Sequence, residues 1–116
     1  YNKLLNHSKM FKTPTALTEY AENIYWAYGI VLSEKCQYDA EQVIHILKER
    51  KIGSRPFFYP MHKQPIFLKM NICNRNQKLP ISEKISRQGF YIPSGLGIKT
   101  EDINYVCNHL KKIFNN

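Results

Sequence analysis

The chain has 116 residues, the length of one domain, since a single hydrophobic core commonly serves about 100–150 residues. With 43% hydrophobic and 22% charged residues it has a globular composition, which excludes a disordered, collagen-like or low-complexity chain. Seventeen basic and nine acidic residues leave a net charge of +8. That surplus favours anionic partners such as phosphates, nucleotides or nucleic acid. The alternative is a solvated basic surface on a piece whose acidic remainder lies elsewhere.

The start of the chain, its longest apolar stretch and its cysteines indicate the cellular compartment that we expect for the protein. Its first residue is Tyr1 rather than Met, and no signal peptide is visible, so we expect a processed chain or a piece of a longer protein. The longest apolar stretch, residues 24–32, is much shorter than the ~20 residues of a membrane helix. The three cysteines are odd in number and widely spaced, which predicts reduced thiols in a cytoplasmic protein.

The first third of the chain predicts one strand after an irregular start. Residues 1–10 are expected to hold the last turns of a helix, and residues 11–18 a loop. Residues 22–32 are rich in aromatic and β-branched side chains, which predicts a strand. Apolar side chains stand at nearly every position of that strand, so we expect both of its faces to be covered.

A helix and a second strand follow. Asp39 is a suitable N-cap for a helix that runs to about Arg50, because its carboxylate can accept backbone N–H groups of the first turn. The apolar face of this helix consists of Ala40, Val43, Ile44 and Leu47. Residues 54–58 are expected to form a short strand that ends near Pro60.

The next region alternates short helices with a loop. Residues 66–70 can form one helical turn, and the asparagine-rich residues 71–78 are expected to be a loop. Pro80 suits the first position of a helix, and Gly89 suits its end. Residues 90–92 then predict a brief third strand.

The C-terminal segment contains the clearest amphipathic helix. Thr100 is expected to be its N-cap, followed by two acidic residues in the first turn. Its apolar residues recur at helical spacing: Ile103, Val106, Cys107, Leu110, Ile113 and Phe114. The order of elements predicts an α/β (α+β) fold, a small three-stranded mixed or antiparallel sheet with helices packed on one face.

Several familiar chemical motifs are missing. Cys107 and His109 lie roughly 200° apart around a helix and cannot share a metal, and no CxxC or HExxH occurs, so no metal ligands are expected. Neither a P-loop nor a dinucleotide-binding motif occurs. Ser94 lies in PSG rather than in GxSxG, which makes a self-contained hydrolase unsupported.

Residues 54–65 stand apart, because three prolines stiffen a run of polar and aromatic side chains. A rigid loop of this kind is a typical ligand wall. Arg55 could pair with a phosphate or carboxylate. One of the aromatic residues Phe57, Phe58 and Tyr59 could stack on a ring, and His62 and Gln64 could bond hydroxyl groups. A purely structural loop, with aromatic side chains in the core, explains the same residues equally well.

The run GSRPFFYPMHKQP at residues 53–65 resembles the C-terminal signature of the DegT/DnrJ/EryC1/StrS family, the pyridoxal-phosphate-dependent sugar-nucleotide aminotransferases. Three further segments resemble motifs of that family in the same order: NIYWAY at residues 23–28, residues 83–96 ending in PSGL, and TEDINYV at residues 100–106. The resemblance covers residues 1–114, and the perosamine-synthetase-like members are the most similar.

The resemblance implies that the whole chain, residues 1–116, is the small C-terminal domain of a fold-type I aminotransferase. The lysine that forms the Schiff base with pyridoxal phosphate, and most cofactor contacts, would belong to an N-terminal domain not present in these residues. Arg55, Tyr59, His62 and Gln64 are then substrate-binding residues by resemblance. No catalytic or cofactor-binding residue is expected here, and the isolated chain should be inactive.

The same resemblance implies an amino transfer, from glutamate to a keto sugar nucleotide, for surface polysaccharide or O-antigen biosynthesis in the cytoplasm. The implied partners are the nucleotide sugar, the N-terminal domain and a second subunit, without nucleic acid or membrane. Lys51 stands where many relatives have glycine, which predicts either a strained left-handed backbone or a shifted helix cap there. A lone domain should also expose apolar surface or self-associate.

Two other interpretations remain open from the residues themselves. A stand-alone basic module that binds nucleotides or nucleic acid would account for the charge of +8. An orphan piece with only a structural role would account for the missing catalytic motifs.

Overall fold

The computed structural model describes residues 1–6 and 8–114. Its elements run in chain order as α1 (Asn2–Leu5), β1 (Phe11–Lys12), β2 (Tyr28–Leu32), α2 (Ala40–Glu49), β3 (Arg55–Pro56), the 3₁₀ turn η1 (Met61–Lys63), α3 (Pro65–Lys69), α4 (Pro80–Gln88), β4 (Gly89–Ile92) and α5 (Thr100–Phe114). None of the described helices is both long and apolar enough to cross a membrane.

The four strands form one antiparallel sheet in the order β1-β2-β4-β3. This confirms the α/β class with a small sheet and decides for the antiparallel arrangement, but the sheet has four strands rather than the predicted three. The strand β1 was predicted as part of a loop, and that prediction was wrong. Phe11 pairs with Leu32 at the sheet edge, and Phe11 is buried against Phe114, with ring centroids 5.1 Å apart.

Alternate residues of the two central strands face the protein core. Ile30 of β2 lies opposite Phe90 of β4, and both are fully buried. The remaining core members come from the helices and strand ends: Leu5, Phe11, Tyr28, Leu32, Ala40, Val43, Leu47, Ile52, Ile92, Val106, Cys107, Leu110 and Phe114. The helices α2 and α5 therefore supply the layer that closes this face of the sheet.

The opposite face of β2 is only partly covered, which corrects the expectation that both faces of the strand are buried. Gly29 and Val31 are only half-buried, between the buried residues of the other face. The regular strand also begins later than predicted, at Tyr28 rather than near residue 22. Tyr25 has a φ of 51°, which breaks the two-residue alternation that a strand requires.

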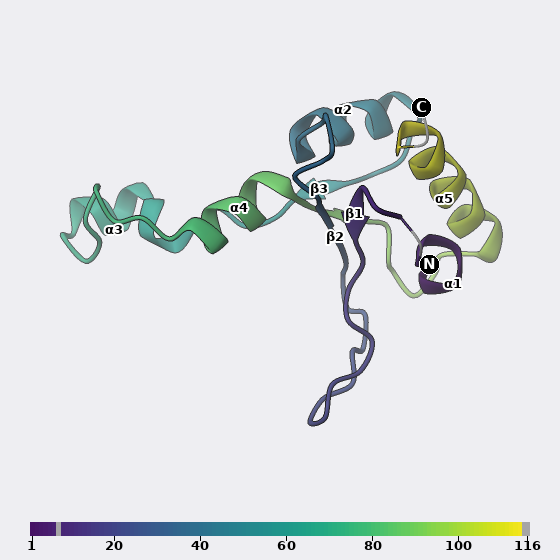
Figure 1. Cartoon of the computed structure of the whole chain (residues 1–116), viewed down its shortest axis with the longest axis horizontal. Coiled ribbons are helices and arrows are strands. Elements are labelled where there is room, and N and C mark those ends of the chain that lie inside the picture. Colours follow the sequence, from purple (N-terminus) through teal and green to yellow (C-terminus); the bar gives the residue numbers. More distant parts are fainter. Residues whose placement is uncertain (7, 115–116) are drawn as a thin grey trace.

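Residues 15–26 form a hairpin that continues from β1 and β2 beyond the end of the sheet (Figure 1). A single bridge joins Leu17 and Glu22 across it. The backbone N–H of Thr18 donates to the Ala21 carbonyl at 2.9 Å and closes the turn. This segment is called the hairpin below.

The ends of α2 agree with the sequence prediction. The Asp39 carboxylate accepts the backbone N–H of Gln42, and the Gln42 side chain accepts the N–H of Asp39, which makes a complete capping box. At the other end the N–H of Ile52 donates to the Leu47 carbonyl. Lys51 has a φ of 58°, so of the two alternatives for this residue the structure shows the left-handed conformation.

The helices α4 and α5 differ in how well their starts were predicted. The helix α4 begins at Pro80 and ends before Gly89, as expected. The helix α5 begins at Thr100, so this residue lies inside the helix rather than at the predicted N-cap. The Asp102 carboxylate accepts the backbone N–H of Lys99 instead, at 3.1 Å.

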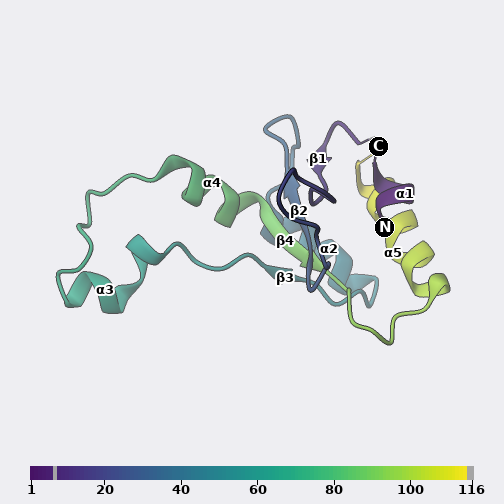
Figure 2. The same cartoon turned by 90° about the horizontal axis from the view of Figure 1, so that it is seen from below.

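Residues 58–88 project from the sheet and return to it through the end of α4, and they are called the arm below. They comprise η1, α3 and α4, and Figures 1 and 2 show them projecting to one side. The radius of gyration is 15.9 Å, against about 13 Å for a compact domain of this length. The arm and the hairpin account for this elongated shape, with principal extents of 48 × 35 × 27 Å.

Candidate functional site

The segment 54–65 starts at the edge of the sheet and leads into the arm. Arg55 lies in β3 opposite Tyr91 and is exposed. A shallow cavity of about 580 Å³ lies beside it, also lined by Lys48 and Ser54. Within the described residues, the Arg55 guanidinium enters no ion pair, so it presents a planar set of donors to solvent.

Tyr59 and Gln64 lie together at the start of the arm. The Gln64 side-chain amide donates to the Tyr59 carbonyl at 3.3 Å, across the turn that Pro60 begins. The Tyr59 side chain is 56% exposed, and Gln64 is half-buried. The Tyr59 ring is thus accessible, whereas the Gln64 amide is partly used to hold the turn.

His62 occupies a different environment, because its side chain is only 3% exposed. Its Nε2 lies 3.0 Å from Oε1 of Glu83 on α4, and Nζ of Lys63 lies 2.8 Å from Oε2 of the same carboxylate. The backbone N–H of Leu79 donates to Glu83 as well. These bonds from Lys63, His62 and Leu79 lower the pKa of Glu83 to about 2. They join η1 to α4 and fix the shape of the arm.

Sequence reasoning missed Glu83, since 21 residues separate it from His62 and no local motif links the two. The buried His62 imidazole is bound to this carboxylate and not to another predicted site residue. Among the four predicted residues, the side-chain hydrogen bond in the described part of the chain joins Gln64 to Tyr59. Arg55 lies at the sheet edge, and His62 lies inside the arm.

An aromatic pair covers part of the open face of the sheet. The Phe57 ring packs directly on the backbone of Gly29 and Gly89, where a Cβ added at Gly29 would approach within 2.9 Å of the ring. The rings of Phe57 and Tyr91 are 4.6 Å apart. Glycine within an apolar strand is the sequence signal that such a close approach leaves.

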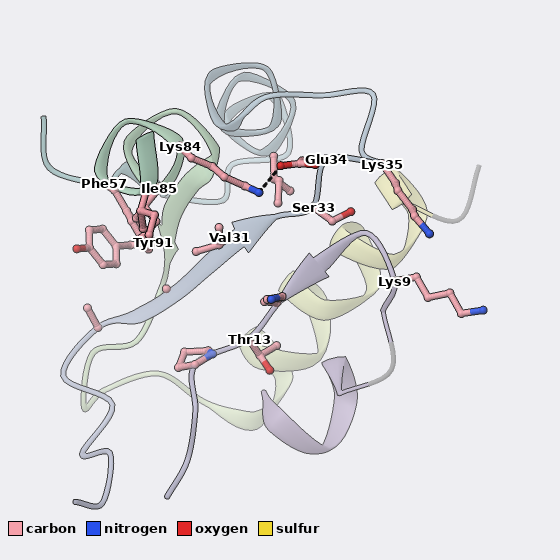
Figure 3. Close-up of a pocket in the computed structure, with 16 residues that line it drawn as sticks. Lys9, Thr13, Val31, Ser33, Glu34, Lys35, Phe57, Lys84, Ile85 and Tyr91 are labelled. Atoms are coloured by element: carbon pink, nitrogen blue, oxygen red, sulfur yellow. Dashed lines mark hydrogen bonds and ion pairs between the residues drawn. The ribbon is translucent and has the colours of Figure 1, made fainter. Parts of the chain in front are cut away.

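Beside this pair the open face forms a cavity of about 1040 Å³, called the sheet-face groove below (Figure 3). Its floor is mostly apolar and consists of Gly29, Val31, Phe57, Ile81, Ile85 and Tyr91. Four lysines stand among its lining residues: Lys9, Lys12, Lys35 and Lys84. Glu34 is ion-paired with Lys84, and this hydrogen bond lowers the pKa of the Glu34 carboxyl. The groove therefore combines an apolar floor with a cationic rim.

A second aromatic cluster lies where the hairpin meets α1. The rings of Tyr1 and Tyr28 are 4.8 Å apart, and those of Tyr25 and Tyr28 are 5.8 Å apart. The Asn2 amide donates to the Tyr25 hydroxyl and accepts from the Tyr28 hydroxyl. Burial is the main cause that raises the pKa of Tyr28 to about 12. This cluster holds Tyr25 in its unusual backbone conformation.

The model of the DegT/DnrJ/EryC1/StrS aminotransferase family matches residues 1–111, almost the whole chain. The chain belongs to this family. The residues that carried the resemblance therefore reflect true membership rather than chance similarity.

Two curated relatives share the family and resemble the chain in sequence. GDP-perosamine synthase of Vibrio cholerae is 30% identical over 91 residues, which cover 78% of this chain and 24% of the relative. GDP-perosamine synthase of Caulobacter vibrioides is 29% identical over 106 residues, which cover 91% of this chain and 27% of the relative. The chain thus spans about a quarter of the length of the curated relatives it matches.

Solved aminotransferase-type structures confirm the fold. Helicobacter pylori PseC, an aminotransferase of pseudaminic acid biosynthesis, matches with a TM-score of 0.81 and 14% identity, over 98% of this chain and 30% of the other. Escherichia coli GDP-4-keto-6-deoxy-D-mannose-3-dehydratase with bound hydrated pyridoxal phosphate matches with a TM-score of 0.77 and 14% identity, over 95% and 28%.

Members of this family use pyridoxal phosphate. An aminotransferase holds this cofactor through a lysine Schiff base, with an acid against the pyridine nitrogen. The lining of the sheet-face groove does not meet these requirements, because its one acidic residue, Glu34, is ion-paired with Lys84 and leaves no free carboxylate for the pyridine nitrogen. Among the described residues, no three His, Cys, Asp or Glu side chains are grouped to hold a metal. No step of the cofactor chemistry is therefore derived from this chain.

Proposed function

We propose that the chain is the C-terminal small domain of a pyridoxal-phosphate-dependent aminotransferase that acts on a keto sugar nucleotide. The observation that carries this proposal is the family match over residues 1–111, supported by a fold match that spans under a third of a complete neighbouring chain. The cofactor and its lysine then belong to an N-terminal domain, and glutamate is the amino donor. GDP-perosamine synthases among the relatives favour a sugar nucleotide as the acceptor.

In this proposal the segment 54–65 faces the substrate. The exposed Arg55 guanidinium suits a phosphate, because its planar donors match two oxygens at once. The exposed Tyr59 ring can stack on a base or sugar, and Gln64 fixes the turn on which Tyr59 stands. The burial of His62 supports a positioning role, since it holds η1 against α4 through Glu83.

The remaining implications of the family resemblance form part of the same proposal. The complete enzyme would be a cytoplasmic homodimer that serves surface polysaccharide or O-antigen biosynthesis. The apolar side chains exposed on the arm and hairpin support contacts with protein outside this chain.

The proposal is tested by comparing the isolated chain with a polypeptide that joins it to an aminotransferase cofactor domain. With added pyridoxal phosphate, the isolated chain should show no Schiff-base absorbance and no transamination of a keto sugar nucleotide. The joined polypeptide should show both, and Arg55→Ala in it should raise KM for the sugar nucleotide about tenfold. A stable Schiff base on the isolated chain would refute the assignment.

A nucleotide- or nucleic-acid-binding module is the second candidate, favoured by the lysine rim of the sheet-face groove. Its test is a salt titration of oligonucleotide binding to the isolated chain. Micromolar binding that weakens steeply as salt rises would support it, because displaced counterions drive such association.

A further inference from the structure

The cavity beside Arg55, called the edge cavity below, lies at the outer edge of the sheet. The strand β3 is the last in the order β1-β2-β4-β3, and α2 packs beside it. Lys48 from α2 and Arg55 from β3 both line this cavity. Two cationic side chains from different elements therefore meet at one place.

Neither of these two charges is neutralised by the rest of the described chain. Lys48 and Arg55 enter none of the ion pairs among residues 1–6 and 8–114. Of the described residues that line the edge cavity, none is acidic. The sheet-face groove differs, because the Glu34 carboxylate lies among its lysines. Like charges that share a site repel each other, so an anion between Lys48 and Arg55 is electrostatically favoured.

The hydroxyl group of Ser54 is an independent indication of a ligand. Its Oγ is buried and has no hydrogen-bond partner among the described residues. A buried hydroxyl without a partner lowers stability, and such groups are rare unless a bound ion or a functional role explains them. Ser54 itself lines the edge cavity, so rotation about its one side-chain bond can bring the hydroxyl to an anion held there.

The donor groups of the edge cavity favour a phosphate over a carboxylate. The Arg55 guanidinium can donate to two oxygens at once, and the Lys48 ammonium and the Ser54 hydroxyl add further donors. A carboxylate presents two oxygens and one negative charge. A phosphate monoester presents three oxygens and a charge of about −1.5 to −2 at pH 7, which matches two cations and a hydroxyl better.

The size and lining of the edge cavity leave room for more than the phosphate itself. Its volume of about 580 Å³ lies within the roughly 300–1,000 Å³ that is usual for small-molecule sites. The apolar side chains of Ile44, Ile52 and Ile92 line another part of it. Such a wall suits the carbon skeleton of a sugar or nucleoside attached to the phosphate.

We propose that the edge cavity binds the phosphate groups of the sugar nucleotide, and that Lys48 and Ser54 hold them together with Arg55. The Lys48 ammonium and the Arg55 guanidinium flank the phosphate, and the Ser54 hydroxyl turns to donate to it. The identity of the ligand rests on the proposed function, in which Arg55 faces the substrate. The cavity itself belongs to this chain, so its binding of phosphate can be measured without cofactor or transamination.

The test is a titration of the 116-residue chain, labelled with ¹⁵N, with inorganic phosphate, guanosine diphosphate or glutamate, followed by amide chemical shifts. The amides of Gly53, Ser54 and Arg55 should shift with both phosphates. Guanosine diphosphate should bind most tightly, with a dissociation constant of about 0.1–1 mM, because its nucleoside covers the apolar wall. Glutamate should bind at least ~10-fold more weakly than guanosine diphosphate.

Substitutions assign the contributions of the three side chains. Lys48→Met and Arg55→Met should each weaken the binding of guanosine diphosphate about tenfold, and Ser54→Ala about threefold. The matched control Lys9→Met/Lys12→Met removes two lysines of the sheet-face groove and should leave the affinity unchanged. Circular dichroism establishes that each variant is folded.

Several results would overturn the proposal. These are shifts confined to the sheet-face groove, equal affinity for glutamate and guanosine diphosphate, and unchanged affinity in the Lys48 or Ser54 variant. Tighter binding of inorganic phosphate than of guanosine diphosphate would identify a site for free phosphate and overturn the assignment to a sugar nucleotide.

The polypeptide that joins this chain to a cofactor domain separates this proposal from the proposed function. Binding of guanosine diphosphate in the edge cavity, without transamination by the joined polypeptide, would refute the proposed function alone. Transamination whose KM for the sugar nucleotide is unchanged by Lys48→Met would refute the edge-cavity site alone.

Discussion

The two faces of the sheet differ in burial, although neighbouring residues of the same strands form them. On the closed face, Ile30 and Phe90 are fully buried beneath α2 and α5. On the open face, Gly29, Val31 and Tyr91 border a groove, and the arm and hairpin extend beyond the sheet. The chain thus builds a closed core on one face of the sheet and leaves a groove on the other face.

The largest expected effect comes from a residue of the closed face. Ile30→Ala should lower the free energy of unfolding by about 3 kcal/mol, because it removes fully buried methyl groups and leaves a cavity. Its neighbour on the open face is the matched control, and Val31→Ala should cost under about 1 kcal/mol. Urea denaturation measures both. Equal losses at the two positions would show that the faces do not differ.

The contact of Phe57 with the open face gives a somewhat smaller effect. A Cβ at Gly89 would overlap the Phe57 ring and the Ile85 carbonyl oxygen. Gly89→Ala should therefore cost about 2 kcal/mol of unfolding free energy. Gly53→Ala is the control, since a Cβ there meets nothing within 4 Å and Gly53 has no positive φ. A Gly89 variant as stable as the Gly53 variant would contradict the packing described here.

The arm should loosen in acid, because Glu83 joins its two ends. Folding lowers the pKa of Glu83 from 4.5 to about 2, so its contribution to stability is present above pH 4.5 and is lost as pH falls toward 2. Pepsin cleavage within α3 should accelerate over this window. Glu83→Gln should cleave quickly throughout it, whereas Glu49→Gln, which alters the His45–Glu49 pair within α2 and outside the arm, should behave like the wild type. A cleavage rate that Glu83→Gln leaves unchanged would contradict this role of Glu83.

The smallest effect concerns the end of α2. Lys51 adopts a left-handed conformation that glycine enters without steric cost, so Lys51→Gly should raise the unfolding free energy by about 0.5–1 kcal/mol. The control Lys48→Gly, in the last turn of the helix, should instead lower it by about 1 kcal/mol. Thermal unfolding distinguishes the two signs. Destabilisation by both substitutions would show that residue 51 is not strained.

Local signals predicted much of this fold. The cap at Asp39, the helix between Pro80 and Gly89, and the left-handed Lys51 all follow from steric and hydrogen-bonding rules that act over a few residues. The start of α5 was displaced by one residue, because Asp102 rather than Thr100 supplies the side-chain cap. Such rules describe each element separately.

What the sequence did not reveal depends on contacts between distant residues. The two-residue strand β1 has no pattern of its own and exists through its pairing with β2. The partnership of His62 with Glu83 joins two elements of the arm that have no shared motif. The sequence did not predict the open face, because a continuous apolar run is found both in strands buried on two faces and in strands with one exposed face.

The most direct measurement is hydroxyl-radical labelling of the isolated chain and of the same chain joined to an aminotransferase cofactor domain. In the isolated chain at low concentration, Trp26, Phe58 and Tyr91 should be labelled, whereas the buried Phe90 should not. Joining the cofactor domain should protect the first three and leave Phe90 unchanged. Labelling of Trp26, Phe58 and Tyr91 that is the same in both proteins would contradict the proposal that a cofactor domain packs against the hairpin, the arm and the open face.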